Sequence, residues 1–129
     1  MIELFTERGV LNTMRIFIFA LAMILADILT GILKAVYKGN INSTILRKGL
    51  LHKLSEIAAI AVSYFIDYGI VYTGINLDLK IGYAVAVYVI LMEIVSTLEN
   101  IAEVNEKLGK FLTPYLEKLK GVSYEQDRD

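Results

Sequence analysis

The fold is decided by the stretch IFIFALAMILADILTGILKAV (residues 16–36). At roughly 1.5 Å per residue, a helix of about 21 residues crosses the ~30 Å hydrocarbon core of a bilayer. Its single acid, Asp27, lies near the middle and is followed by Thr30, Gly31 and Lys34. A carboxylate at that depth costs about 2.5–3.5 kcal/mol on insertion scales. We therefore expect a membrane span whose Asp27 faces protein or water rather than lipid.

The composition also indicates a membrane protein. Of the 129 residues, 56% are hydrophobic, whereas soluble domains contain about 45–50% apolar residues even when glycine is counted. The apolar run at residues 16–36 exceeds the ~7–15 residues of a signal-peptide core, and no small-residue cleavage site follows it. We interpret it as a retained span.

Nothing in the sequence indicates catalysis or a cofactor. There is no cysteine, so disulfides, thiol catalysis and cysteine metal sites are excluded. The single histidine, His52, has no nucleophile or triad partner, and with Glu56 it makes only two of the ligands that a metal site needs. The net charge of −1, without a basic stripe, favours no nucleic-acid partner.

Two further apolar stretches, residues 57–75 and 81–98, repeat the pattern of one acid per span, with Asp67 in the second and Glu93 in the third. The short polar turn between them nearly forces an antiparallel hairpin. These segments are apolar almost all round, unlike the helices of a soluble bundle, which is the alternative. The predicted fold class is all-α, an integral membrane protein with three transmembrane helices.

The remaining segments are predicted to be amphipathic. A helix over residues 44–55, capped by Asn42 or Ser43, would run on into the second span. Residues 99–120 show apolar positions at steps of three and four and would form two helices, jointed at Thr113–Pro114, on the inner membrane surface or against a neighbouring subunit. Residues 1–120 would form one membrane domain, with a short interfacial helix or a frayed end before the first span, and 121–129 a disordered polar tail.

Positive charges predict the orientation. The segment between the first two spans carries Lys38, Arg47, Lys48 and Lys53, while the turn between the second and third carries only Lys80. The positive-inside rule makes the first loop cytoplasmic, so the N-terminus lies outside and the C-terminus inside. The four basic residues of this loop would point to water or to anionic lipid headgroups.

Each span carries a narrow stripe of small and polar residues around its acid. Small residues let helices approach closely and polar residues bond across the contact. We therefore expect Thr30, Gly31, Gly82 and Ala86 to pack helices together, and Asp27, Asp67 and Glu93 to lie between helices. Either the stripes join many copies around a wet lumen, or the acids pair inside a closed monomeric bundle, for instance Asp27 with Lys34 of another helix. A small ion carrier is a third possibility.

Four segments resemble the phage-lysis and toxin-secretion holin family of small three-span proteins: DILTGILKAV (residues 27–36), NSTILRKGLLHKL (42–54), MEIVSTLENIAEV (92–104) and KFLTP (110–114). The positions that match the family pattern are Asp27, Thr30, Gly31, Ala35, Ser43, Gly49, Lys53, Glu93, Ser96, Glu99, Asn100 and Pro114. Thr113 departs from it, since apolar residues are common before that proline.

The resemblance implies a holin, which oligomerises in the bacterial cytoplasmic membrane and forms lesions that release an endolysin or export a large toxin, so that the host cell lyses. The implied partners are further copies of the chain and the phospholipid bilayer, with a peptidoglycan hydrolase or a toxin as the functional partner. The alternatives are a non-permeabilising antiholin-like regulator and a small ion-conducting protein.

Overall fold

The computed structural model describes the backbone of residues 2–128 and the side chains of residues 4–122. The elements in chain order are η1 (Ile2–Phe5), α1 (Glu7–Lys38), α2 (Ser43–Gly69), η2 (Ile70–Thr73), α3 (Ile81–Val104) and α4 (Glu106–Arg128), with no strand in the described part of the chain. The helical segments Glu7–Lys38, Ser43–Thr73 and Ile81–Val104 are long and apolar enough to cross a membrane. The predicted all-α membrane protein with three spans is confirmed.

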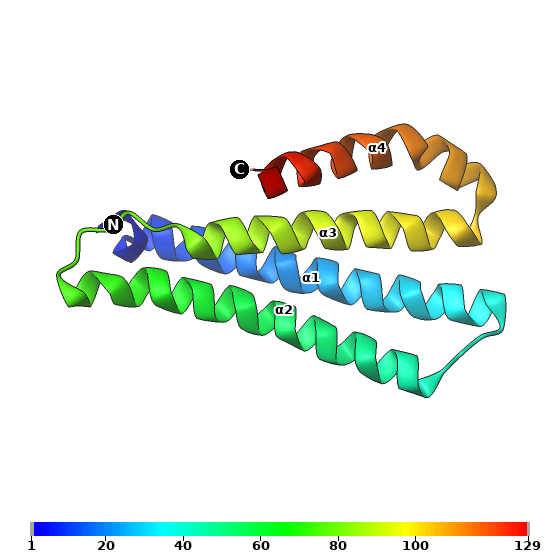
Figure 1. The fold of residues 1–129 in the computed structure, drawn as a ribbon, viewed down its shortest axis with the longest axis horizontal. Helices are drawn as coiled ribbons and strands as arrows, with labels where there is room; N and C mark the ends of the chain where they lie inside the picture. Colours follow the sequence, from blue (N-terminus) through cyan, green and yellow to red (C-terminus); the bar gives the residue numbers. More distant parts are fainter. Residues whose placement is uncertain (1, 129) are drawn as a thin grey trace.

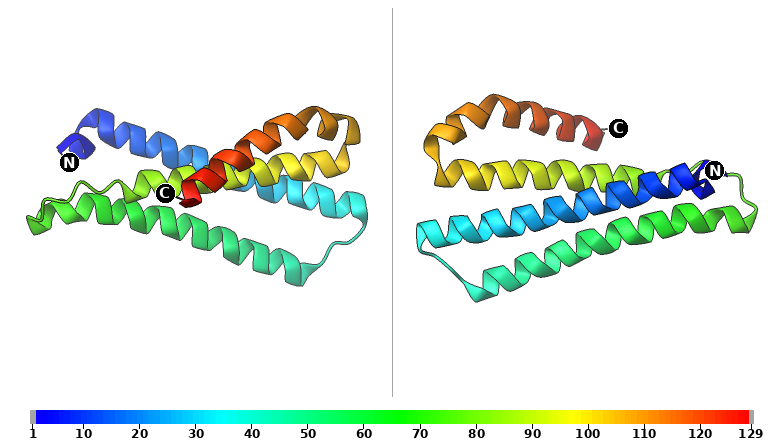
Figure 2. Two further views of the ribbon diagram at one scale, coloured as in Figure 1. Left: turned by 45° about the horizontal axis from the view of Figure 1, so that its top comes forward. Right: turned by 180° about the vertical axis from the view of Figure 1, so that it is seen from behind.

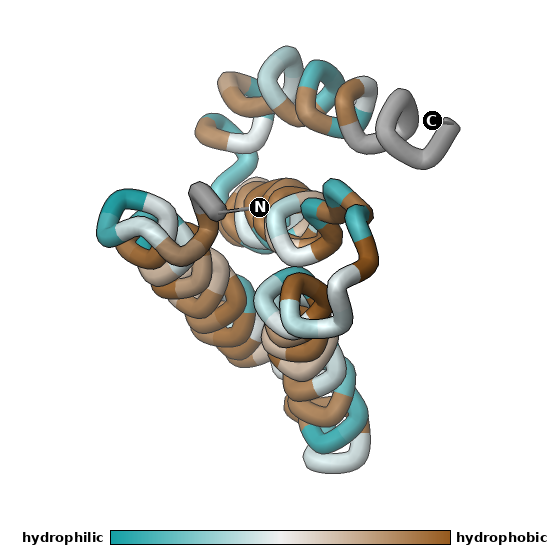
Figure 3. The backbone as a smooth tube through the Cα atoms, turned by 90° about the vertical axis from the view of Figure 1, so that its left-hand side faces the viewer, coloured by the Kyte–Doolittle hydropathy of each residue, from teal (hydrophilic) through white to brown (hydrophobic). Residues whose placement is uncertain are grey.

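Helix α3 is the centre of the arrangement. Helices α1 and α2 pack along one side of it and touch each other much less, while α4 folds back along the other side (Figure 1). Two further views show the same order of helices (Figure 2). The core consists of pairs of residues from the three spans: Ala20 and Ile24, Ile60 and Tyr64, and Ala86 and Val89. Hydrophobic residues predominate along the spans (Figure 3), and many of their large side chains are exposed, as on a lipid-facing surface.

Local signals explain the ends of α1 and the start of α2. Helix α1 begins earlier than the expected span because the Thr6 hydroxyl accepts a hydrogen bond from the Gly9 N–H at 3.0 Å. It ends at Gly39, whose φ of 69° is left-handed and favours glycine. The Asn42 side chain then accepts from the N–H groups of Thr44 and Ile45. The prediction that one helix runs through the first loop into the second span is confirmed.

The C-terminal part differs from the prediction. The break lies at Asn105, not at Thr113–Pro114, so α3 continues to Val104 and Pro114 lies inside α4. Asn105 has extended backbone angles, and its side chain caps α4 by accepting from the Leu108 N–H at 3.1 Å. Pro114 bends the helix rather than ending it, and α4 is visibly arched in Figure 1.

The expected disordered tail also differs from the structure. Helix α4 continues to Arg128, and the chain after Gly121 contains neither proline nor glycine. Asp129, the last residue of the expected tail, lies outside the described residues.

Candidate functional site: a buried charge cluster between the three spans

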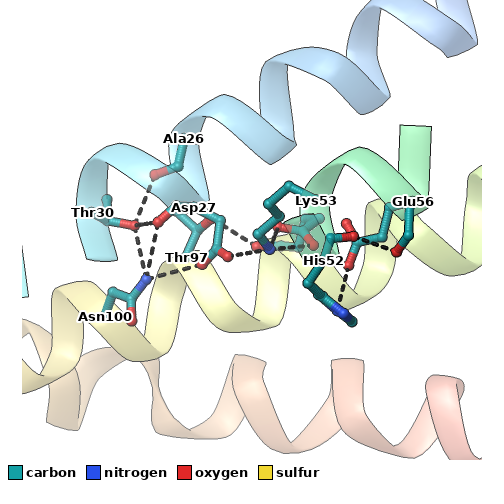
Figure 4. A network of polar contacts seen from close by, with 10 residues as sticks. Ala26, Asp27, Thr30, His52, Lys53, Glu56, Thr97 and Asn100 are labelled. Atoms are coloured by element: carbon teal, nitrogen blue, oxygen red, sulfur yellow. Dashed lines mark hydrogen bonds and ion pairs between the residues drawn. The ribbon is translucent and has the colours of Figure 1, made fainter. Parts of the chain in front are cut away.

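One lysine joins the three spans. The Nζ atom of Lys53 on α2 lies 2.5 Å from Oδ2 of Asp27 on α1 and 2.6 Å from both carboxylate oxygens of Glu93 on α3. The side chains are 14%, 9% and 2% exposed, respectively. Figure 4 shows Lys53 reaching across to Asp27. Since α1 and α2 touch little elsewhere, this cluster is a main tie between them.

The position of Lys53 corrects the expectation that it points to water or lipid phosphates. Lys53, Ile60 and Asp67 recur at intervals of seven residues, so they share the face of α2 that packs on α3. This seven-residue spacing is the feature of the sequence that indicates a buried position for Lys53. The expected pairing of Asp27 with Lys34 is replaced as well, since Lys34 lies 3.8 Å from Glu103.

Further polar side chains surround Asp27. The Asn100 Nδ2 donates to Oδ1 of Asp27 at 2.9 Å and to the Thr30 hydroxyl at 3.1 Å. The Thr30 hydroxyl donates to the Ala26 carbonyl at 2.8 Å (Figure 4). The Ser96 side chain also interacts with the Asp27 carboxylate. In the sequence, Asn100 and Ser96 stood out only as positions that match the family pattern, yet both interact with this carboxylate from α3.

A second carboxylate lies beside Glu93. Glu56 interacts with Glu93, and its Oε1 lies 3.0 Å from Nε2 of the neighbouring His52, with which it forms an ion pair when the imidazole is protonated. Its other oxygen, Oε2, is buried and has no hydrogen-bond partner. Over residues 4–122, no three histidine, aspartate or glutamate side chains are grouped so that they could hold a metal ion. The chemistry that the cluster offers is ion pairing between helices.

Asp67 forms a separate site at the opposite end of α2. Its carboxylate accepts from the backbone N–H groups of Ile81 at 3.1 Å and Gly82 at 2.7 Å. These are the first residues of α3, whose own N-cap residue, Lys80, makes no side-chain cap. A negative charge at a helix N-terminus is stabilising. Asp67 therefore caps α3 from the preceding helix, and the three acids do not form one constellation.

Of the four residues expected to pack helices together, two lie in tight contacts between helices and two do not. A Cβ at Gly82 would overlap the Tyr64 ring, so α2 and α3 approach closely there. Ala86 is fully buried in the core. Gly31 faces Asn100, but a Cβ there would stand 3.7 Å from the amide nitrogen, so a methyl group fits. Thr30 belongs to the polar network.

The other motif residues lie outside the cluster. Lys38 forms an ion pair with Glu103 at 2.6 Å, while Arg47 and Lys48 are exposed at the start of α2. Ser43 is the first residue of α2, Gly49 lies in its exposed part, and Ala35 is half-buried near the end of α1. Glu99 pairs with Lys120 of α4 at 2.7 Å. The two ion pairs therefore join α1 to α3 and α3 to α4.

Comparison with known proteins identifies a matching protein family. A family model described as the bacteriophage holin family matches residues 7–121. An uncharacterized protein from Halalkalibacterium halodurans is 30% identical over 101 residues, which cover 78% of this chain and 75% of that protein. No solved structure matches.

Proposed function

This chain belongs to the bacteriophage holin family, and from that premise we propose that it oligomerises in the bacterial cytoplasmic membrane and forms lesions. These lesions would release an endolysin, or export a large toxin, and so cause host cell lysis. The observation that carries the proposal is the family match over residues 7–121, which includes the three helices able to span a membrane.

The buried charges give a physical reason why the helix bundle would open into a lesion. Removing ions from water is costly, and pairing in the interior repays this only in part. Asp27, Lys53 and Glu93 are held inside a single chain, so a rearrangement that turned these side chains toward a wet lumen would restore their hydration. In this proposal the cluster holds the harmless state, and the same residues line the lesion after assembly.

Membrane potential is the proposed trigger. A charge that crosses the field changes its energy by about 2.3 kcal/mol per 100 mV. A depolarising agent added to cells that already express the chain should therefore advance lysis. Unchanged lysis time after depolarisation would contradict this trigger.

The exposed basic residues of the first loop would hold it at the membrane surface. Arg47 and Lys48 are exposed, and each lysine or arginine near anionic headgroups contributes about 1 kcal/mol. The N-terminus would lie outside and the C-terminus inside the cell, as the positive-inside rule favours.

Induction of this chain alone in bacteria tests the proposal. We expect growth arrest, collapse of the membrane potential and release of a co-expressed peptidoglycan hydrolase. Normal growth with an intact potential would reject it. Loss of the potential with the hydrolase retained would reject protein-sized lesions and leave the small ion-conducting alternative.

Two variants test the residues. Asp27→Asn removes the charge that pairs with Lys53, and Gly31→Leu crowds Asn100; both should shift or abolish lysis while the protein still inserts, as measured by immunoblot of membranes. Gly49→Ala, at a position with open space around it, is the matched control and should lyse on time. Unchanged timing in both variants would leave Asp27 a purely structural residue.

A non-permeabilising antiholin-like regulator is the second candidate. It is favoured by the way in which Asp27, Lys53 and Glu93 pair within one chain and leave no charge of the cluster exposed. This candidate predicts that induction of the chain alone leaves the potential intact, and that co-expression delays lysis by a permeabilising holin.

A further inference from the structure

Helix α4 lies against α3 along only one edge of its apolar side. Gly109 permits a close approach, because a Cβ there would stand 3.0 Å from the Ala102 carbonyl oxygen. Lys120 adds the ion pair with Glu99. Val95 of α3 is buried although it is not part of the core shared with α1 and α2. Over residues 106–122, the half-buried residues of α4 are Gly109, Leu112, Leu116 and Leu119.

The other edge of the apolar side has no partner. Leu108, Phe111, Tyr115 and Val122 are 40%, 64%, 53% and 47% exposed, respectively. They fall on one line along the helix, and the rings of Phe111 and Tyr115 lie 5.8 Å apart. The apolar side of α4 is therefore wider than its contact with α3.

The charges of α4 are arranged as on a helix that lies on a membrane. At about 100° per residue, Lys107 and Lys118 border the exposed apolar edge and Lys120 borders the opposite one. Glu106 and Glu117 lie at the middle of the polar side. Lysines at the edges can bury their stems and reach phosphate groups, while the glutamates face water.

The docked position of α4 does not suit a bilayer. Helix α3 spans the membrane, and α4 runs back beside it (Figure 1), which would bring the charged side of α4 to hydrocarbon depth. The two helices are joined by Asn105 alone, in extended conformation. A change of the backbone angles at this residue would move α4 away from α3 and leave both helices intact.

We propose that α4 binds the phospholipid surface of the leaflet at which α3 ends. Its apolar side lies at the boundary of headgroups and acyl chains, and Lys107, Lys118 and Lys120 contact anionic headgroups. The position against α3 is the one that α4 leaves on membrane binding. This inference goes beyond lesion formation and requires only that α3 spans the bilayer.

Single cysteines test the binding, because the chain has none of its own. Full-length Phe111→Cys and Lys110→Cys proteins, each labelled with an environment-sensitive fluorophore, are placed in vesicles of anionic phospholipid with brominated acyl chains. We expect quenching several-fold stronger at position 111 than at position 110, on the polar side. Equal quenching at the two positions would overturn the proposal.

The apolar edge of α4 could instead bind a second copy of the chain, and the Phe111→Cys protein distinguishes this case from lipid binding. Unlabelled Phe111→Cys protein is tested for disulfide-linked dimers in dilute vesicles. Dimers, together with no quenching of the labelled protein, would assign the exposed apolar edge of α4 to a second copy and overturn the lipid assignment. The separation of α4 from α3 is measured in a Glu99→Cys/Lys120→Cys protein, as the yield of cross-linking by a short bismaleimide. We expect efficient cross-linking in detergent and a several-fold loss in vesicles, and equal yields would contradict undocking.

The charge dependence is tested with vesicles of zwitterionic lipid alone. Quenching at position 111 should fall there, and a Lys107→Gln/Lys118→Gln background should reduce the difference between the two lipids. No effect of lipid charge would refute the role of the lysines. These assays need no lysis, so a chain that fails to lyse cells but shows this quenching pattern rejects the proposed function and leaves the inference standing.

Discussion

At the scale of residues, Lys53 has the largest consequences. It is the cation between Asp27 and Glu93, and all three side chains are withdrawn from solvent. Loss of one partner from a buried ion pair costs about 3–5 kcal/mol, because the remaining charge is left uncompensated. An exposed lysine of the same helix carries no such penalty, since surface charges contribute little.

We predict that Lys53→Met lowers the free energy of unfolding by about 3–5 kcal/mol, whereas Lys53→Arg retains most of it. The measurement is unfolding in detergent micelles followed by circular dichroism. Lys48→Met, on the exposed part of α2, is the matched control and should change stability by less than about 0.5 kcal/mol. Equal effects at positions 48 and 53 would argue against the buried cluster.

Asp67 gives a second prediction. Asp67→Ala leaves the N–H groups of Ile81 and Gly82 without their acceptor, at a cost of about 1–3 kcal/mol. The exposed Asp78 lies in the loop between the same helices, so Asp78→Ala serves as the control in the same unfolding assay. A neutral Asp67→Ala would show that another group caps α3.

At the scale of elements, α3 organises the molecule because every other long helix packs on it. Its start is held by the Asp67 cap and by the close contact of Gly82 with Tyr64. Its end leads through a single extended residue into α4. The first contact is closely packed, and the second is the place where the proposed movement of α4 would occur.

Two glycines test the close contact. Gly82→Ala should destabilise the protein by about 1–3 kcal/mol, because the new methyl overlaps the Tyr64 ring. Gly49→Ala, in the open part of α2, should be neutral or stabilise the helix by up to about 1 kcal/mol. Tyr64→Leu should relieve part of the Gly82→Ala defect, and the absence of any relief would place the clash elsewhere.

At the scale of the whole molecule, basic residues gather at one end. The end with the α1–α2 turn carries Lys34, Lys38, Arg47 and Lys48, and the first two of these pair with Glu103. At the opposite end, the α2–α3 loop lies beside the start of α1 (Figure 1) and carries one acid and one lysine. The interior holds the buried charges and the exterior of the spans is apolar. The proposed lesion therefore requires this closed bundle to rearrange, so that its buried charges can face water.

Labelling from outside the cell tests the proposed orientation. Asn76→Cys, in the α2–α3 loop, should react with a membrane-impermeant maleimide in intact cells, and Asn40→Cys, in the α1–α2 turn, only after permeabilisation. The reverse pattern would invert the orientation. Reaction at both sites in intact cells before lysis would mean that the membrane is already permeable.

The sequence by itself determined the number and order of the spans, because the free energy of placing a helix in lipid depends on the composition and length of that helix alone. The turn at Gly39 and the hairpin followed from local signals of the same kind. Only the tertiary structure decided that Lys53 turns inward to Asp27 and Glu93, that Asp67 caps α3 and that the chain bends at Asn105. The partner of a charge depends on which helix faces meet, and those faces belong to segments far apart in the chain.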